Sequence, residues 1–208
     1  MIRALVLDFG NVISEPQDIS CYERMSALSG LPADFFRNAF WKYREPFDRG
    51  TIRGQEMYKQ VLEDAGLRLQ DEKLNDLIEQ LLAEDLGSWF HVSDDVTNWA
   101  LKLQKEGYIL GILSNMPYDF LERFGDRVQL FQKADVAIFS CQIHLVKPEP
   151  EIYKVLFDRT GCVPEEIVFF DDIAQNVAAA AKIGIHAFVW SGLDDAKKRF
   201  TQLSQHNV

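Results

Sequence analysis

Five short apolar runs recur along the chain, and stretches with helical periodicity separate most of them. The runs are residues 2–8, Tyr108–Leu113, Val136–Phe139, Ile167–Phe170 and His186–Trp190. Continuous apolar runs of this length are typical of strands that are buried on both faces of a parallel sheet. Strands that alternate with helices therefore predict an α/β fold with a doubly wound, Rossmann-like parallel sheet.

Two helical stretches lie between the later runs. Val96–Glu106 has apolar positions at helical spacing, and Ser93 is placed to act as its N-cap. Ile173–Ile183 is the second, and Gly184 is placed to end it. Both predict helices that connect neighbouring parallel strands.

The interval from about residue 16 to residue 87 differs, because it has helical periodicity and no convincing strand. Leu31–Tyr43, Gly54–Ala65 and Asp71–Leu86 each predict an amphipathic helix, the last with Asp71 as its cap. The strand runs on both sides then belong to one core. We therefore expect a sheet core made of residues 1–15 and 88–208, interrupted by an all-helical domain of residues 16–87.

Charge and cysteine content narrow the classes of partner. The 208 residues carry a formal charge of -10, which argues against binding to nucleic acid or to an anionic membrane. Three widely separated cysteines fit neither a disulfide framework nor structural zinc. No run approaches about 18 apolar residues, so no membrane span is expected. We expect a reduced, cytoplasmic protein that is a monomer or a homodimer.

Polar side chains follow several of the predicted strands, either at the strand end or in the next loop. They are Asp8, Ser114, Asn115, Lys147, Asp171 and Asp172. Ligands of an open parallel sheet bind outside the carboxyl ends of the strands, where these residues should meet. The sequence thus brings three carboxylates, one hydroxyl and one lysine to the same edge.

Three converging carboxylates would repel one another unless a hard divalent cation such as Mg2+ joined them. Lys147 and Ser114 would then hold phosphate oxygens, and Asp8 would be either a metal ligand alone or a metal ligand and nucleophile. Singly, each residue fits a turn, a helix cap or a solvated loop equally well. Their joint placement favours a site. Asn176, in the first turns of the next helix, would either orient the acidic pair or face solvent.

These residues resemble the haloacid dehalogenase-like (HAD) hydrolase superfamily over nearly the whole chain. Four segments resemble its motifs in the right order: Leu7–Ile13, Ile112–Asn115, Lys147-Pro148, and Phe169–Asp172 with Asn176. The inserted helical domain resembles the small cap domain of subfamily I. The resemblance implies a hydrolase with a Rossmann-like core and a helical cap.

The resemblance also implies a role for each motif residue. Asp8 would be the nucleophile that becomes an aspartyl-phosphate, and the backbone carbonyl of Gly10 would join Asp8 and Asp172 around Mg2+. Asp171 would act on the metal through water. The side chains of Ser114 and Lys147 would bind the phosphoryl oxygens. The backbone of Asn11 and Asn115 would assist.

Position 10 departs from the phosphatase pattern, which has a second aspartate there as general acid and base. Gly10 can do neither, and general acid-base catalysis contributes about 10²–10⁴-fold. One branch of the superfamily shares the Asp-x-Gly-Asn pattern and includes a sugar phosphatase that acts on glucose 1-phosphate, whose leaving group needs less protonation. Water or a cap side chain would supply the rest of the protonation; the cap segment Tyr43–Gln55 is the candidate source, unless it is only a solvated interhelical turn. The candidates there are Arg44, Glu45, Asp48, Arg49 and Arg53.

The favoured function is therefore a Mg2+-dependent phosphatase of a small phosphorylated metabolite, with a sugar 1-phosphate as one candidate. One alternative is a haloacid dehalogenase, because a halide leaves without a proton. The Asp171-Asp172 pair argues against it. A second alternative is a protein that binds a phosphorylated ligand without turnover, because Gly10 removes proton transfer.

Overall fold

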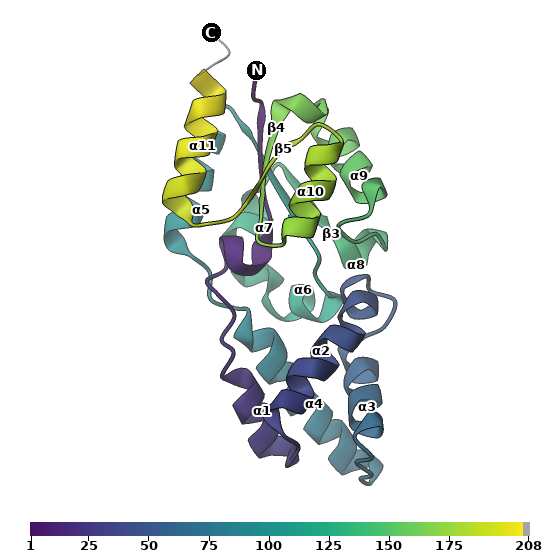
Figure 1. Ribbon diagram of the computed structural model, residues 1–208. Helices are drawn as coiled ribbons and strands as arrows, with labels where there is room; N and C mark the ends of the chain where they lie inside the picture. Colours follow the sequence, from purple (N-terminus) through teal and green to yellow (C-terminus); the bar gives the residue numbers. More distant parts are fainter. Residues whose placement is uncertain (206–208) are drawn as a thin grey trace.

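A five-stranded, fully parallel sheet forms the centre of the computed structural model, which describes residues 1–205 (Figure 1). The strand order is β3-β2-β1-β4-β5, and the predicted doubly wound α/β fold is confirmed. The last residues of the predicted segment 88–208 lie outside the described chain. The strands are β1 (Ala4–Leu7), β2 (Ile109–Ser114), β3 (Val136–Phe139), β4 (Ile167–Asp171) and β5 (His186–Val189).

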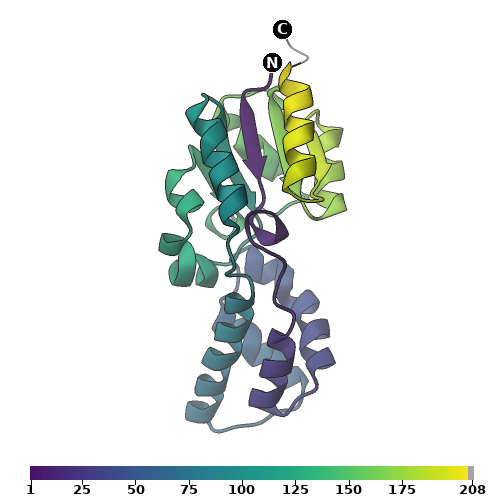
Figure 2. The same cartoon turned by 90° about the vertical axis from the view of Figure 1, so that its left-hand side faces the viewer.

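Helices cover both faces of the sheet (Figure 2). Side chains alternate along β1, so Leu5 and Leu7 pack in the cluster that includes α5 (Asp94–Lys105) and α11 (Leu193–Gln205). Ala4 and Val6 point to the opposite face. There they share a cluster with α9 (Pro150–Thr160) and α10 (Ala174–Lys182). Both faces are apolar, which explains the continuous strand runs. Ser93 caps α5 as predicted, accepting a hydrogen bond from the Val96 backbone.

Four helices form a separate lobe beyond the carboxyl ends of the strands (Figures 1 and 2). We call these four helices the helical lobe: α1 (Cys21–Ser29), α2 (Ala33–Asp48), α3 (Gly54–Asp64) and α4 (Asp71–Ser88). Its two connections to the core lie side by side, since Ser14 and Val92 form an antiparallel bridge. The assignment of residues 16–87 to a domain of their own stays a prediction.

The helical lobe corrects three details of the sequence analysis. Helix α1 was not predicted, and α4 begins at Asp71 behind Gln70, which makes no side-chain cap. Helix α2 continues past Tyr43 to Asp48 although Pro46 removes a backbone donor. The buried Phe47 ring offsets this loss, since burying such a side chain contributes about 1.5–3 kcal/mol. The last turn of α2 is therefore helical and is not an interhelical turn.

Short elements carry the chain between the main ones. They are η1 (Phe9–Ile13), α6 (Tyr118–Phe124), η2 (Gly125–Arg127), α7 (Gln129–Lys133), α8 (Ser140–Ile143) and η3 (Pro164–Glu166). Among residues 1–205, no helix combines the length and apolar character needed to cross a membrane.

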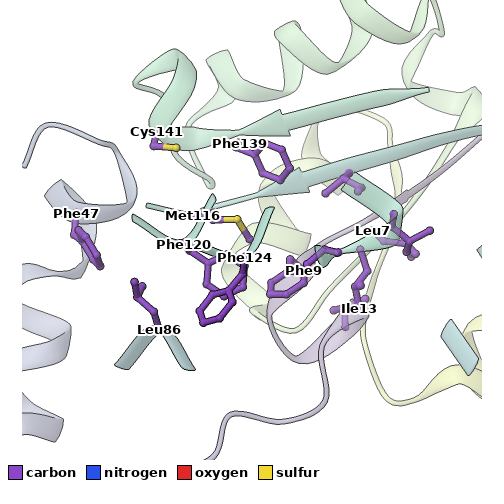
Figure 3. Close-up of a cluster of buried hydrophobic side chains, with 14 of the residues drawn as sticks. Leu7, Phe9, Ile13, Phe47, Leu86, Met116, Phe120, Phe124, Phe139 and Cys141 are labelled. Carbon is purple, nitrogen blue, oxygen red and sulfur yellow. The ribbon is translucent and has the colours of Figure 1, made fainter. Parts of the chain in front are cut away.

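One hydrophobic cluster runs across the junction between the helical lobe and the core (Figure 3). Phe47 of α2 and Leu86 of α4 lie on the lobe side, facing Met116 and Phe120 of the core. Phe120 in turn packs against Phe9, with ring centroids 5.1 Å apart. Because Phe9 follows Asp8, this packing fixes the lobe directly over the polar ends of the strands.

Candidate active site

The first strand ends on Asp8, whose buried carboxylate accepts a hydrogen bond from the Phe9 backbone at 2.7 Å. The chain then turns through Asn11, a non-glycine residue with φ of 57°. Asparagine tolerates this left-handed conformation better than most residues. Its backbone N–H donates to Ser14 Oγ at 3.0 Å, which closes the turn. The turn keeps Asp8 and Asn11 at the same edge of the sheet.

Lys147 lies between two carboxylates and is only 3% exposed. Its Nζ is 2.6 Å from Asp171 Oδ2 and 3.0 Å from Asp8 Oδ1, and it also donates to the Leu113 carbonyl at 2.8 Å. Burial alone would lower the pKa of Lys147, but the charges of Asp171 and Asp8 outweigh it and raise that pKa. Lys147 is therefore a fixed buried cation, supported from β1, β2 and β4.

Asp171 is held by donors from its own loop and from α10. The Ile173 backbone donates to Oδ1 at 2.8 Å, and Asn176 Nδ2 lies 3.1 Å from both carboxylate oxygens. The carboxylate has no exposed surface. Asn176 thus lies against Asp171 and orients it, the first of the two arrangements considered from the sequence.

Three carboxylates meet at this edge, since oxygens of Asp8, Asp171 and Asp172 lie within 4.8 Å of one another. Burial raises the pKa of Asp8 to about 7, Lys147 opposes the shift, and Asp171 and Asp172 add to it. Burial also raises the pKa of Asp172, although its Oδ2 accepts a hydrogen bond from Asn11 Nδ2 at 2.7 Å. One lysine cannot balance three carboxylates, so the oxygen cluster fits a hard divalent cation.

The loop that carries Lys147 is fixed to the end of β2 by Asn115. The Asn115 side chain donates to the Lys147 carbonyl at 2.9 Å and accepts from the Lys147 backbone N–H at 2.8 Å. Ser114, directly before it, is buried at the strand end. The sequence analysis assigned only backbone roles to Asn11 and Asn115, and their side chains were missed because both contacts span long separations along the chain.

A cavity of about 590 Å³ lies between these residues and the helical lobe. The core contributes Asp8, Gly10, Asn11, Ser114, Asn115, Lys147, Asp172 and Asn176 to its lining. The helical lobe contributes Phe40, Trp41, Arg44, Glu45, Asp48 and Leu86, and Trp89 follows directly after α4. The ends of the strands and side chains of α2 and α4 thus line one cavity together.

Of the five candidates for a proton donor in the segment Tyr43–Gln55, Arg44, Glu45 and Asp48 line this cavity and Arg49 and Arg53 do not. Arg49 instead forms a two-pronged pair with Glu149, with Nη2 2.6 Å from Oε1. Arg53 pairs with Glu122 and lies 3.7 Å from Asp119. These two arginines are therefore engaged in contacts between the lobe and the core.

Trp89 lies directly over Gly10, a contact that the sequence analysis missed. The Gly10 backbone has φ of -61° and ψ of 127°, which any residue can adopt. A Cβ there would lie 3.4 Å from Cζ3 of the Trp89 ring. A Cβ at position 10 would thus be in ordinary contact with the Trp89 ring, which borders the space beside that position. No local sequence signal distinguishes Trp89 from an aromatic residue that only packs in the core.

The model of the haloacid dehalogenase-like hydrolases matches residues 2–184. The chain belongs to this family. Among relatives of the HAD-like hydrolase, the phosphorylated carbohydrates phosphatase of Thermotoga maritima is 29% identical over 204 residues, covering 94% of this chain and 89% of that protein. Bifunctional epoxide hydrolase 2 of Sus scrofa is 25% identical over 220 residues, which cover 98% of this chain. The match covers only 39% of that relative's length, and 35% of its mouse and rat counterparts.

Solved structures share the fold of this HAD-like hydrolase. A HAD family enzyme of Bacteroides thetaiotaomicron, solved with magnesium and inorganic phosphate, has a TM-score of 0.74 at 21% identity, covering 95% of this chain and 99% of that one. The 2-haloacid dehalogenase of Pseudomonas syringae has a TM-score of 0.66 at 16% identity, covering 97% and 99%. Since a dehalogenase shares the fold, the reaction has to be argued from the site.

Proposed function

We propose that this HAD-like hydrolase is a Mg2+-dependent phosphatase of small phosphorylated metabolites that reacts through an aspartyl-phosphate on Asp8. The observation that carries the proposal is the cluster of Asp8, Asp171 and Asp172 within 4.8 Å, beside the buried cation of Lys147. A dianionic phosphate needs this combination of a metal site and a fixed cation. Relatives called phosphorylated carbohydrates phosphatase and D-ribitol-5-phosphate phosphatase support it.

Asp8 would attack phosphorus with one carboxylate oxygen as the bond from phosphorus to the leaving oxygen breaks. Lys147 and Ser114 would hold the phosphoryl oxygens, assisted by the backbone N–H groups of Asn11 and Asn115. Water would then cleave the aspartyl-phosphate and release phosphate. Bound Mg2+ would neutralise the charge that gathers there, held by the ligands Asp8, Asp172 and the Gly10 carbonyl, with Asp171 acting through water.

The helical lobe would act as the cap domain, residues 16–87, over a core of residues 1–15 and 88–208. The cavity of about 590 Å³ has the size of a site for a small metabolite, and a sugar 1-phosphate is one such ligand. Aromatic and charged lobe residues would contact its non-phosphate part. We propose a cytoplasmic enzyme that works as a monomer or homodimer.

The test is release of inorganic phosphate from a panel of phosphorylated metabolites, with Mg2+ and with EDTA. We expect metal-dependent release that Asp8→Asn abolishes. Asp158→Asn, on the exposed face of α9, is the matched control and should keep full activity. Absence of release from the whole panel, or equal release by Asp8→Asn, would refute the proposal.

Dehalogenation is the second candidate, because position 10 is a glycine and carries no acid. A halide leaves without a proton, so the missing acid at position 10 would not matter. Turnover of 2-haloacids that survives EDTA would establish this reaction in place of the first. Capture of a metal-fluoride phosphoryl mimic without turnover of any substrate would instead indicate a binding protein.

A further inference from the structure

The phosphatase reaction leaves one chemical task without a residue, protonation of the leaving oxygen. Position 10 has no side chain, and the Trp89 ring borders the space beside it. Asp8, Asp171 and Asp172 are committed to the nucleophile and the metal site. For an ester with a poor leaving group, the remaining source of a side-chain proton is another acidic residue that reaches the cavity.

Within the described chain, two acidic side chains of the helical lobe line the cavity, Glu45 and Asp48. The Glu45 side chain is 57% exposed and forms an ion pair with Arg49. Asp48 is only 6% exposed, and its Oδ2 accepts a hydrogen bond from Arg44 Nε at 2.7 Å. The other oxygen, Oδ1, is buried and has no hydrogen-bond partner among residues 1–205. A buried polar oxygen without a partner is costly, so Oδ1 is available to form a hydrogen bond with a ligand in the cavity.

Charge balance around Asp48 also favours a retained proton. Asp48 and Asp85 are both buried, and the guanidinium of Arg44 acts on both. Two carboxylates beside one guanidinium leave an excess negative charge, which a proton relieves. Burial raises the pKa of Asp48 to about 6, Arg44 opposes the shift, Asp85 adds to it, and Lys147 opposes it from the core side.

Asp85 lies behind this pair and does not line the cavity. Burial raises its pKa as well, with Arg44 opposing the shift. Tyr58 and Trp89 lie beside its carboxylate, but neither completes a hydrogen bond to Asp85 Oδ2. Asp48 is therefore the member of the pair whose proton can reach a ligand.

The backbone of Asp48 is hydrogen-bonded to the core next to Ser114 and Asn115. Ser140 Oγ donates to the Asp48 carbonyl at 2.5 Å and accepts from the Met116 backbone N–H at 2.8 Å. Two residues further on, a Cβ at Gly50 would lie 2.8 Å from the Cys141 carbonyl oxygen. These hydrogen bonds and the close approach of Gly50 to Cys141 fix the position of Asp48 relative to Ser114 and Asn115. A proton donor requires such a fixed position.

We propose that Asp48 donates the proton to the leaving oxygen and later accepts one from water, an inference that rests on the proposed phosphatase function. As Asp8 bonds to phosphorus, the bond to the leaving oxygen breaks and the Asp48 proton moves to that oxygen, releasing the alcohol. Water then enters the vacated position. Asp48, now a carboxylate, takes its proton as the oxygen bonds to phosphorus, and the bond to Asp8 breaks. Phosphate leaves, and both residues return to their starting forms.

The test compares Asp48→Asn with the unaltered enzyme on two classes of ester. Asparagine keeps the shape and an oxygen acceptor for Arg44 but has no acidic proton. With a simple alkyl phosphate we expect turnover to fall by about 10²-fold or more, the typical contribution of general acid-base catalysis. With 4-nitrophenyl phosphate, whose leaving group needs no proton, the first-turnover burst of nitrophenolate should keep its rate. Steady-state turnover should still slow, because water lacks its base.

The preserved burst shows that the variant is folded and that its nucleophile is intact. Asp64→Asn, an exposed lobe carboxylate that accepts from Tyr43 Oη at 2.6 Å, is the control and should leave both activities unchanged. If Asp48→Asn lowers the burst and the alkyl rate equally, or changes neither, the assignment is overturned. Asp48→Ala adds a second arm, in which formate should restore alkyl turnover, and failure to restore it counts against the assignment. Failure of the unaltered enzyme to release phosphate from either class would instead count against the phosphatase proposal itself.

Discussion

Replacing the buried lysine of the active site should destabilise the protein far more than replacing a surface lysine. Lys147 Nζ lies 2.6 Å from Asp171 and 3.0 Å from Asp8, and neither carboxylate side chain is more than 9% exposed. In Lys147→Met the two carboxylates lose their cation without gaining solvent. Removing one partner of a buried pair costs about 3–5 kcal/mol, because the remaining charge is left uncompensated.

The expected loss is large enough to measure by urea or thermal unfolding without metal. In a chain of 208 residues, a loss of about 3–5 kcal/mol corresponds to roughly 6–20 °C in the unfolding midpoint. Lys154→Met is the matched control, because the Lys154 side chain is 69% exposed and pairs with Glu151 only at 3.8 Å. Its unfolding free energy should change by about 0.5 kcal/mol or less.

Two conditions sharpen the interpretation of the Lys147→Met result. Mg2+ should reduce the difference in unfolding free energy between Lys147→Met and the unaltered protein, because a bound cation replaces part of the missing positive charge. Mildly acidic buffer should narrow it too, because protonation relieves the repulsion between Asp8 and Asp171. Equal stability of Lys147→Met and Lys154→Met in neutral, metal-free buffer would refute the reasoning, since it would mean that the carboxylates do not need the lysine.

Three further predictions follow from the same contacts. The carboxylate of Gly10→Asp has to lie beside the Trp89 ring, which is 3.4 Å from the new Cβ, so this variant should speed alkyl phosphate hydrolysis less than Gly10→Asp with Trp89→Ala; an equal or larger gain in the single variant would contradict this. Burial raises the pKa of Cys21 to about 11 and of Cys141 to about 12, so neither should react with an aromatic disulfide at about pH 8 until the chain is unfolded. The pKa of Asp48 is raised from 3.8 in the unfolded chain to about 6 in the folded protein. The stabilisation from protonated Asp48 is therefore complete below pH 3.8 and is lost as the pH rises through about 6. Asp48→Asn should flatten that part of the stability curve, measured by urea unfolding, and an unchanged slope would contradict the assignment.

The sheet was predictable because its central strands β1, β2 and β4 are buried on both faces. Helices cover the two faces, so each of these three strands is a nearly continuous apolar run that ends at or just before a polar residue. The parallel arrangement then places Asp8, Ser114 and Asp171 at one edge without any knowledge of tertiary contacts. For this reason the core fold and the convergence of the motif residues followed from the pattern alone.

Contacts between the helical lobe and the core were not predictable from the same patterns. Glu45 and Asp48 are both acidic residues in the last turns of one helix, and only tertiary packing exposes the first and buries the second. The segment Tyr43–Gln55 was weighed as a solvated turn, but the chain turns only after Asp48, because α2 with its buried Phe47 continues past Pro46. Trp89 over Gly10 is likewise a contact between distant segments, so no local signal marks it.

The nucleophile and the proposed acid lie on different parts of the molecule, and this division has a mechanistic consequence. Asp8 is supported by the core, through Lys147 and the Phe9 backbone. Asp48 reaches the cavity from α2, where Ser140 fixes its backbone. Any displacement of the helical lobe would therefore remove the acid without disturbing the nucleophile. Esters with good leaving groups would still react, and those with poor ones would not, so the position of the lobe would itself select among substrates.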